Sequence, residues 1–166
     1  MTAPTLNEDF LDLLTAFVEE GVEFLLVGAF ALAANGAPRF TGDLDVWVRP
    51  EPINAERVLL GLRRFGAPVD VHGVEVADLG RPGSIYQMGL PPRRIDVLTQ
   101  IDGVTFDEAW RGRIEARVAG VTMPFLGLRE LVRNKRAAGR PKDLLDIELL
   151  REAGAPVDDS SDEGDG

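Results

Sequence analysis

The stretch Thr41-Gly42-Asp43-Leu44-Asp45-Val46-Trp47-Val48 places two carboxylates on a predicted strand. Side chains on a strand alternate with a period of two, so we expect Asp43 and Asp45 on one face and the apolar residues between them on the other. Two carboxylates this close repel each other unless a cation lies between them. Oxygen ligands of this kind suit Mg²⁺, which usually takes one or two carboxylates together with substrate phosphates. The alternative is a pair of solvated acids at a strand edge, because the D-x-D pattern is short.

A third acid lies further along the chain, in Arg93-Arg94-Ile95-Asp96-Val97-Leu98. Asp96 is the one carboxylate in an otherwise apolar predicted strand, and an isolated buried charge is costly without a partner. It could act as a third metal ligand or a general base beside Asp43 and Asp45. A salt bridge to Arg94 or another arginine is the alternative.

Small residues follow an earlier apolar strand, where the run 22–27 leads directly into Gly28-Ala29 and a predicted helix. Small side chains at such a turn leave the first amides of the helix accessible, and helix N-terminal amides bind phosphate. Tight packing of helix against sheet explains the same pair of residues without any ligand.

A basic segment lies between Arg129 and Lys142. It holds six bases and one acid, and these are Arg129, Glu130, Arg133, Lys135, Arg136, Arg140 and Lys142. This segment predicts a basic rim beside the substrate-binding site. Asp143 opens the following helix, where it could hold a neighbouring base or serve as an ordinary helix cap.

Composition narrows the chemistry that the chain can perform. The 166 residues include no cysteine and one histidine, which excludes thiolate nucleophiles and cysteine-ligated metal sites. The formal net charge of −10 argues against broad, charge-driven coating of nucleic acid. No signal sequence or long apolar run is visible, so we expect a cytoplasmic protein that does not enter a membrane.

Hydrophobic periodicity predicts one α/β (α+β) domain over residues 1–155 and a disordered acidic tail over 156–166. The expected helices cover 7–20, 28–34, 52–65, 106–111, 128–138 and 141–153, and the expected strands cover 22–27, 44–48, 95–101 and 116–123. Residues 68–90 are predicted to form short strands connected by turns. The predicted architecture is a mixed β-sheet flanked by helices, with a helical C-terminal end.

Taken in order, these motifs resemble a known family. The Gly28-Ala29 turn, then Arg39-x-Thr41-x-Asp43-x-Asp45, then Asp96 between apolar residues, is similar to the nucleotidyltransferase fold of the DNA polymerase β superfamily. The run from Lys135 to Ile147 resembles the third and fourth motifs of its abortive-infection (AbiEii-type) toxin branch. The resemblance spans roughly residues 20–150, and it depends on the ordered set rather than on any one motif.

The resemblance implies transfer of a nucleoside monophosphate from an NTP to an acceptor hydroxyl, with two Mg²⁺ ions as cofactors. Asp43, Asp45 and Asp96 would ligate the metals, and Asp96 would also help to activate the acceptor. The residues implied in nucleotide binding are Gly28, Ala29, Arg39, Thr41, Lys135, Lys142 and Asp143.

The sequence does not identify the acceptor. A tRNA end, a protein and a small molecule are all compatible with it. A toxin–antitoxin role with a cognate antitoxin as partner is implied by the toxin-like branch. Ala29 stands where the family usually has glycine or serine, which removes a hydroxyl from the phosphate loop. That departure favours an alternative, a nucleotide- or partner-binding module on the same fold with weak chemistry.

Overall fold

The computed structural model describes residues 6–38, 43–91 and 93–157. Arg39, Thr41 and residues 158–166 of the predicted tail therefore lie outside the described residues, whereas Val157, also assigned to the tail, is buried in the core. Six strands form one mixed sheet in the order β3-β4-β2-β1-β6-β5. Their bounds are β1 (Phe24–Leu26), β2 (Leu44–Val48), β3 (Ile85–Met88), β4 (Ile95–Leu98), β5 (Ile114–Val118) and β6 (Val121–Phe125). β1 pairs with β6 and β2 pairs with β4 in parallel, and the other neighbours are antiparallel.

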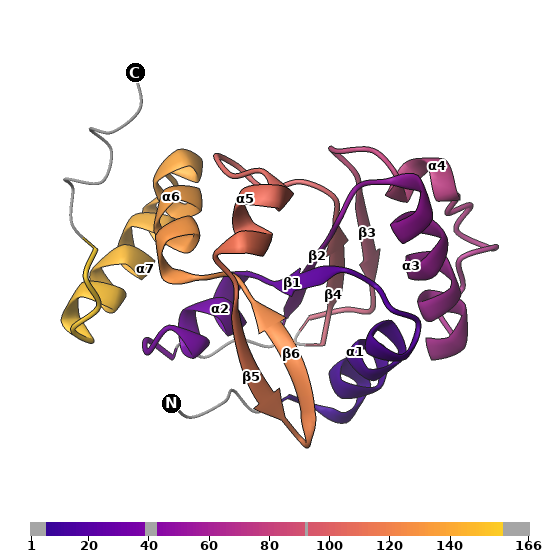
Figure 1. Cartoon of the computed structure of the whole chain (residues 1–166), viewed down its shortest axis with the longest axis horizontal. Helices are drawn as coiled ribbons and strands as arrows, with labels where there is room; N and C mark the ends of the chain where they lie inside the picture. The colour runs from indigo at the N-terminus through magenta and orange to yellow at the C-terminus, as the bar shows by residue number, and fades with distance from the viewer. Residues whose placement is uncertain (1–5, 39–42, 92, 158–166) are drawn as a thin grey trace.

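Helices cover both faces of this sheet (Figure 1). On one side lie α1 (Glu8–Glu19), α3 (Pro52–Phe65) and α4 (Val76–Leu79). On the other lie α5 (Phe106–Arg111), α6 (Leu128–Ala138) and α7 (Pro141–Glu152), while α2 (Gly28–Ala34) contributes to the core on both. The predicted fold class, a mixed sheet flanked by helices with a helical C-terminal end, is confirmed.

The alternation of side chains along β2 separates two hydrophobic cores. Leu44, Val46 and Val48 pack with α1 and α3 in the first core. Trp47 points to the opposite face and packs with α5, α6 and α7 in the second core. Because Asp45 also lies between Leu44 and Val46 in the chain, it shares the face of Trp47, as the period of two predicts.

Two segments differ from the prediction. The single strand expected over 116–123 is wrong, because the chain reverses at Ala119-Gly120 and forms the β5–β6 hairpin. Both turn residues have positive φ, 51° for Ala119 and 82° for Gly120, and alanine at such a position is an uncommon turn signal. Within 68–90, only β3 is a strand, and α4 is a short helix opened by a reciprocal cap between Glu75 and Asp78.

No helix within the described ranges combines the length and the apolar character that a membrane span requires.

Candidate active site

Asp45 and Asp96 lie directly opposite each other on the parallel strands β2 and β4. Their neighbours in the ladder, Leu44 with Ile95 and Val46 with Val97, are buried on the other face of the sheet. The two carboxylates therefore emerge side by side on the face covered by α6 and α7. Asp96 is 7% exposed.

Arg94 contacts two of the three predicted metal ligands. Its Nε lies 3.2 Å from Oδ1 of Asp96, and its Nη2 lies 3.5 Å from Oδ2 of Asp43. The contact with Asp96 is electrostatic, because both Nε and Oδ1 are buried without a hydrogen bond of acceptable geometry. The salt-bridge alternative for Asp96 is therefore present in this arrangement, and Arg94 supplies the positive charge that the acids require.

The surroundings of Asp45 shift its pKa upward. Burial, then the negative charges of Asp96 and Asp43, raise the pKa of Asp45 from 3.8 to about 6. Arg94 and Lys135 oppose this shift without cancelling it. When neighbouring acids raise the pKa of a carboxyl group, a cation that joins the cluster stabilises the ionised form of that group.

Gly28 lies against this cluster at the start of α2. A Cβ atom at residue 28 would stand 2.4 Å from Oδ2 of Asp45, and the backbone has φ of +62°. Only glycine satisfies both conditions, because it lacks the Cβ atom and tolerates positive φ. The next residue, Ala29, is 8% exposed. The predicted phosphate loop and the acid pair are thus adjacent in space.

Lys135 is buried between α6 and α7 rather than presented at a rim. Its Nζ lies 3.2 Å from Oδ1 of Asp143 and 3.0 Å from Oδ2 of Asp146. Arg140 adds a hydrogen bond from Nε to Oδ2 of Asp143 at 2.6 Å. Burial alone would raise the pKa of Asp143, but the hydrogen bonds from Arg140 and Lys135 outweigh it and hold that pKa below its ordinary value.

This buried cluster still acts on the acids of the candidate site through its charge, since Lys135 lowers the pKa of Asp45. The sequence predicts Lys135 and Asp143 in the nucleotide site and Arg140 on its basic rim, and it assigns no role to Asp146. The signal for Asp146 was the three-residue spacing from Asp143, which puts both acids on one side of α7.

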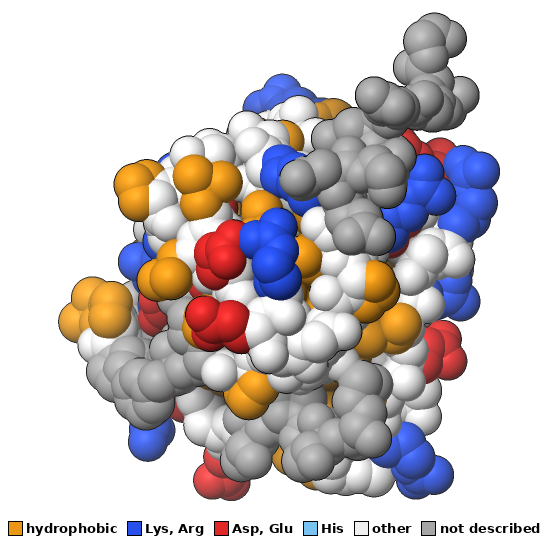
Figure 2. Space-filling model, turned by 90° about the vertical axis from the view of Figure 1, so that its left-hand side faces the viewer, with side chains coloured by type: hydrophobic (Ala, Val, Ile, Leu, Met, Phe, Trp, Pro, Cys, Tyr) orange, Lys and Arg blue, Asp and Glu red, His pale blue; other side chains and the backbone are white. Residues whose placement is uncertain are grey.

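The basic segment does not form a continuous basic surface. Arg133 pairs with Glu108 on α5, while Lys135 and Arg140 pair with acids of α7. Lys142 is exposed on the first turn of α7. On the face shown in Figure 2, Lys and Arg side chains stand among acidic and hydrophobic ones.

The donor set suits a hard divalent cation, since three carboxylates lie close together and Oδ1 of Asp96 is buried without a hydrogen bond. In the described part of the chain, however, no three acidic or histidine side chains are arranged so that they could hold an ion together as they stand. Arg94 engages Asp43 and Asp96 in this arrangement. The acids suit such an ion in kind and charge, but Arg94 would have to release Asp43 and Asp96 before they could ligate it.

The arrangement of strands and helices matches the nucleotidyltransferase fold of two solved structures. The lincosamide antibiotic adenylyltransferase LnuA, in its lincomycin-bound structure, superposes with a TM-score of 0.53 at 12% identity, covering 90% of this chain and 98% of LnuA. A Thermotoga maritima protein assigned to the nucleotidyltransferases superposes with a TM-score of 0.52 at 15% identity, covering 89% of this chain and 94% of that protein. No family model and no curated protein matches the sequence.

Proposed function

We propose that this chain is an Mg²⁺-dependent nucleotidyltransferase that moves a nucleoside monophosphate from an NTP to an acceptor hydroxyl. One observation carries the proposal: Asp45 and Asp96 are in register on parallel strands, with Gly28 in contact distance of Asp45. The fold shared with two nucleotidyltransferase structures supports it.

Asp43, Asp45 and Asp96 would hold the metal ions. Bound there, divalent cations supply charge neutralisation for the attacking and leaving oxygens of an in-line displacement. The acceptor oxygen forms a bond to the α-phosphorus, the bond from that phosphorus to the bridging α–β oxygen breaks, and pyrophosphate leaves. Asp96 takes the proton of the acceptor hydroxyl, since it is the most buried of the three acids.

The residues around the acids bind and orient the nucleotide in this proposal. The Gly28 and Ala29 amides face the triphosphate, and the resemblance implies Arg39 and Thr41, which lie outside the described residues, as further nucleotide contacts. Arg94, once it releases the carboxylates, is available to the phosphates. Lys135 acts at a distance, through its charge and by holding α6 against α7.

Incubation with each α-labelled NTP and Mg²⁺ tests the proposal. The acceptor is supplied as three separate lysate fractions: small molecules, RNA and protein. We expect label in one fraction, equimolar pyrophosphate release, and loss of both with Asp45→Asn. If no NTP gives label or pyrophosphate, the alternative is favoured, namely a binding module with weak chemistry. Ala29, in place of the family's usual glycine or serine, is the observation that supports this alternative.

The finer predictions of a toxin–antitoxin role, a cognate antitoxin and a cytoplasmic location belong to this proposal as well. The toxin–antitoxin role and the antitoxin depend on the resemblance of residues 135–147 to the AbiEii-type branch, whereas the cytoplasmic location depends on the N-terminal sequence and the apolar pattern. Co-expression of the chain with a candidate antitoxin, scored by growth, tests the toxin–antitoxin role separately from the chemistry, and cell fractionation tests the location.

A further inference from the structure

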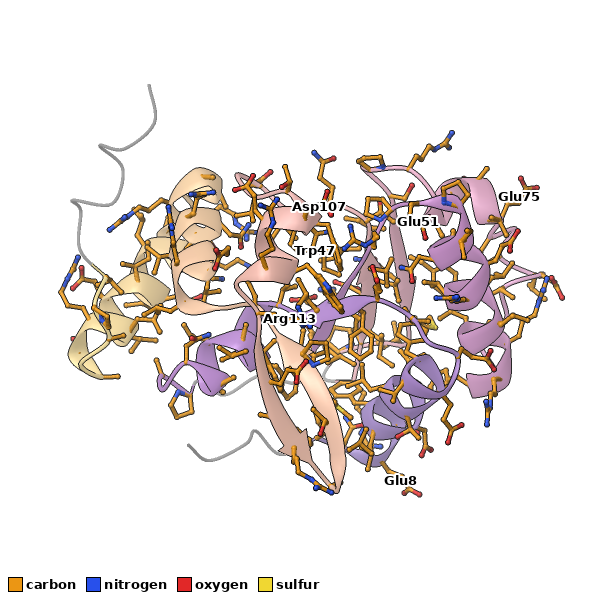
Figure 3. All side chains as sticks on the ribbon, in the orientation of Figure 1. Glu8, Trp47, Glu51, Glu75, Asp107 and Arg113 are labelled. Carbon is orange, nitrogen blue, oxygen red and sulfur yellow. The ribbon has the colours of Figure 1, made fainter. Side chains whose placement is uncertain are left out.

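Gln87 lies in line with two acids of the candidate site. The strands β2, β4 and β3 are neighbours, and their pairing places Asp45 opposite Asp96 and Asp96 opposite Gln87. Residues directly opposite each other in a ladder project from the same face, so Asp45, Asp96 and Gln87 form one row across three strands. Trp47, two residues after Asp45, lies on the same face and packs against α5 (Figure 3).

The Gln87 side chain stands close to Asp96 and is not engaged elsewhere. The backbone amide of Thr99 donates to the carbonyl of Ser84 at 3.0 Å, and hydrogen-bonded pairs alternate with non-hydrogen-bonded pairs along an antiparallel ladder. Gln87 and Asp96 are therefore a non-hydrogen-bonded pair, in which Cα atoms are about 4.5 Å apart and side chains are closest. Gln87 is exposed, and no other residue of the described part of the chain hydrogen-bonds its side-chain amide.

The two ends of this row differ. Gly28 lies at the Asp45 end, where a Cβ atom would stand 2.4 Å from Oδ2 of Asp45. In the proposed function the Gly28 turn holds the triphosphate, so the leaving pyrophosphate lies at that end. The attacking oxygen of an in-line displacement enters opposite the leaving oxygen. The acceptor therefore approaches from the other end, where Asp96 and Gln87 stand.

The Gln87 end of the row is open to solvent. β3 is the edge strand of the sheet, and no described strand lies beyond it (Figure 1). Tyr86 and Met88 point into the first core, whereas Ile85 and Gln87 alternate with them and are exposed. An acceptor can therefore reach Asp96 by crossing the β3 edge, and it meets Gln87 first.

A neutral amide suits the position beside Asp96. A carboxylate there would add to the repulsion within the acid cluster, and an ammonium group would pair with Asp96 and compete with a metal ion. The glutamine amide does neither. It both donates and accepts hydrogen bonds, so it can satisfy a hydroxyl group, which does the same. The chemistry of this side chain favours an uncharged group as its ligand.

We propose that Gln87 binds the acceptor: its amide hydrogen-bonds an uncharged, hydroxyl-bearing group that enters over the β3 edge and presents its hydroxyl to Asp96. The inference rests on the proposed function, which it deepens by assigning a residue to the acceptor side of the site. Gln87 takes no part in binding the nucleotide or the metal ions. Its removal should therefore affect the acceptor alone.

The position of Gln87 is tested without turnover. The chain has two glutamines, so ¹⁵N labelling of glutamine side chains gives two amide signals, which Gln100→Met assigns. Mn²⁺ is the probe, because its unpaired electrons broaden the signals of nearby nuclei. Gln100 follows Asp96 by four residues, about 13 Å along an extended chain. We expect Mn²⁺ to broaden the Gln87 signal at a lower concentration than the Gln100 signal, and equal broadening of the two overturns the placement.

The acceptor role is tested by kinetics, with a dilution series of the lysate fraction that takes up label as the acceptor. Gln87→Met keeps the length of the side chain and removes its hydrogen-bonding groups, and Gln100→Met is the matched control. We expect Gln87→Met to raise the amount of the fraction needed for half-maximal transfer about three- to ten-fold. The NTP concentration at half-maximal rate should stay unchanged, and Gln100→Met should change neither quantity.

An acceptor requirement that Gln87→Met leaves unchanged refutes the assignment, although label transfer itself would still support the proposed reaction. An equal rise in the NTP requirement refutes it as well, because Gln87 would then contact the nucleotide. If the wild-type chain labels no fraction, the proposed reaction fails and the acceptor role fails with it, whatever the Mn²⁺ broadening shows. The two proposals can thus be told apart when one of them fails.

Discussion

Asp45 and Asp96 face each other across the β2–β4 ladder, and Arg94 joins the second of these acids to Asp43. The guanidinium of Arg94 therefore contacts two of the three carboxylates, and its charge also favours the ionised form of Asp45. Such an arrangement is a stable resting state only while no stronger cation is present, since a divalent ion offers the same oxygens more charge and direct ligation.

Arg94→Gln is expected to lower the thermal stability of the chain in EDTA and to tighten Mn²⁺ binding about three- to ten-fold, because a competing charge is removed. Mn²⁺ affinity is measured by electron paramagnetic resonance, and stability by thermal melting with and without Mg²⁺. Arg93→Gln is the matched control, since Arg93 is the exposed neighbour in the chain. Weaker Mn²⁺ binding in Arg94→Gln than in Arg93→Gln would mean that Arg94 organises the acids rather than competing for them.

Asp45 makes the metal-free chain less stable as the pH rises. The folded chain holds the proton of Asp45 up to a pKa of about 6, whereas the unfolded chain releases it near 3.8. Stability therefore falls between about pH 4 and pH 6. Asp45→Asn removes this penalty, so in EDTA we expect the variant to be more stable than the wild type by about 1–3 kcal/mol at pH 7 and equal to it near pH 4.

Urea unfolding in EDTA at the two pH values measures the effect of Asp45→Asn, with Mg²⁺ added in a second series. The metal should stabilise the wild type more than the variant. A variant that is less stable than the wild type at pH 7 in EDTA would show that Asp45 has a structural role.

Lys135 and Lys142 form a natural pair for comparison on the helical end. Lys135→Met leaves Asp143 and Asp146 buried without that cation, and we expect a loss of about 3–5 kcal/mol in the free energy of unfolding. Lys142→Met changes an exposed side chain and should stay within about 0.5 kcal/mol. If Lys135→Met keeps its stability and weakens NTP binding instead, then Lys135 contacts the nucleotide directly.

Gly28→Ala should disrupt the acid cluster, because the added Cβ atom meets Oδ2 of Asp45 at 2.4 Å. Gly36→Ala is the control, since Gly36 has φ of +98° with nothing within 4 Å of the added atom. Both variants carry the cost of a positive φ at a residue with a Cβ atom, about 1–2 kcal/mol. Only Gly28→Ala should also weaken Mn²⁺ and NTP binding, and equal binding in the two variants would contradict the proposed contact.

Ala29→Ser tests the departure from the family pattern. The added hydroxyl restores a group that the resemblance places at the triphosphate, so NTP affinity should be preserved or increased by a few-fold. Isothermal titration with a non-hydrolysable NTP analogue measures it. Loss of binding with an unchanged melting temperature would show that this turn does not cradle phosphate.

Local sequence signals determined most of the elements of this protein and the identity of its acidic cluster. The helices over 28–34, 52–65 and 106–111 begin and end as their periodicity predicts, and the period of two along β2 places Asp45 with Trp47. These features depend on neighbours in the chain, whose geometry the backbone dictates. The sequence does not predict the β5–β6 turn, because an Ala-Gly pair is a weak turn signal.

Tertiary structure alone decided which charges meet. The resemblance placed Lys135 beside the nucleotide, yet the packing of α6 on α7 encloses it with Asp143 and Asp146. Arg94 was one candidate partner for Asp96 among many arginines, and the β2–β4 pairing brought Asp43 within its reach. The burial of Trp47 depends on the distant residue Phe106, whose ring packs edge-on against the indole. Partners this distant are selected by packing and by the cost of burying charge, and neither quantity is defined until the chain has folded.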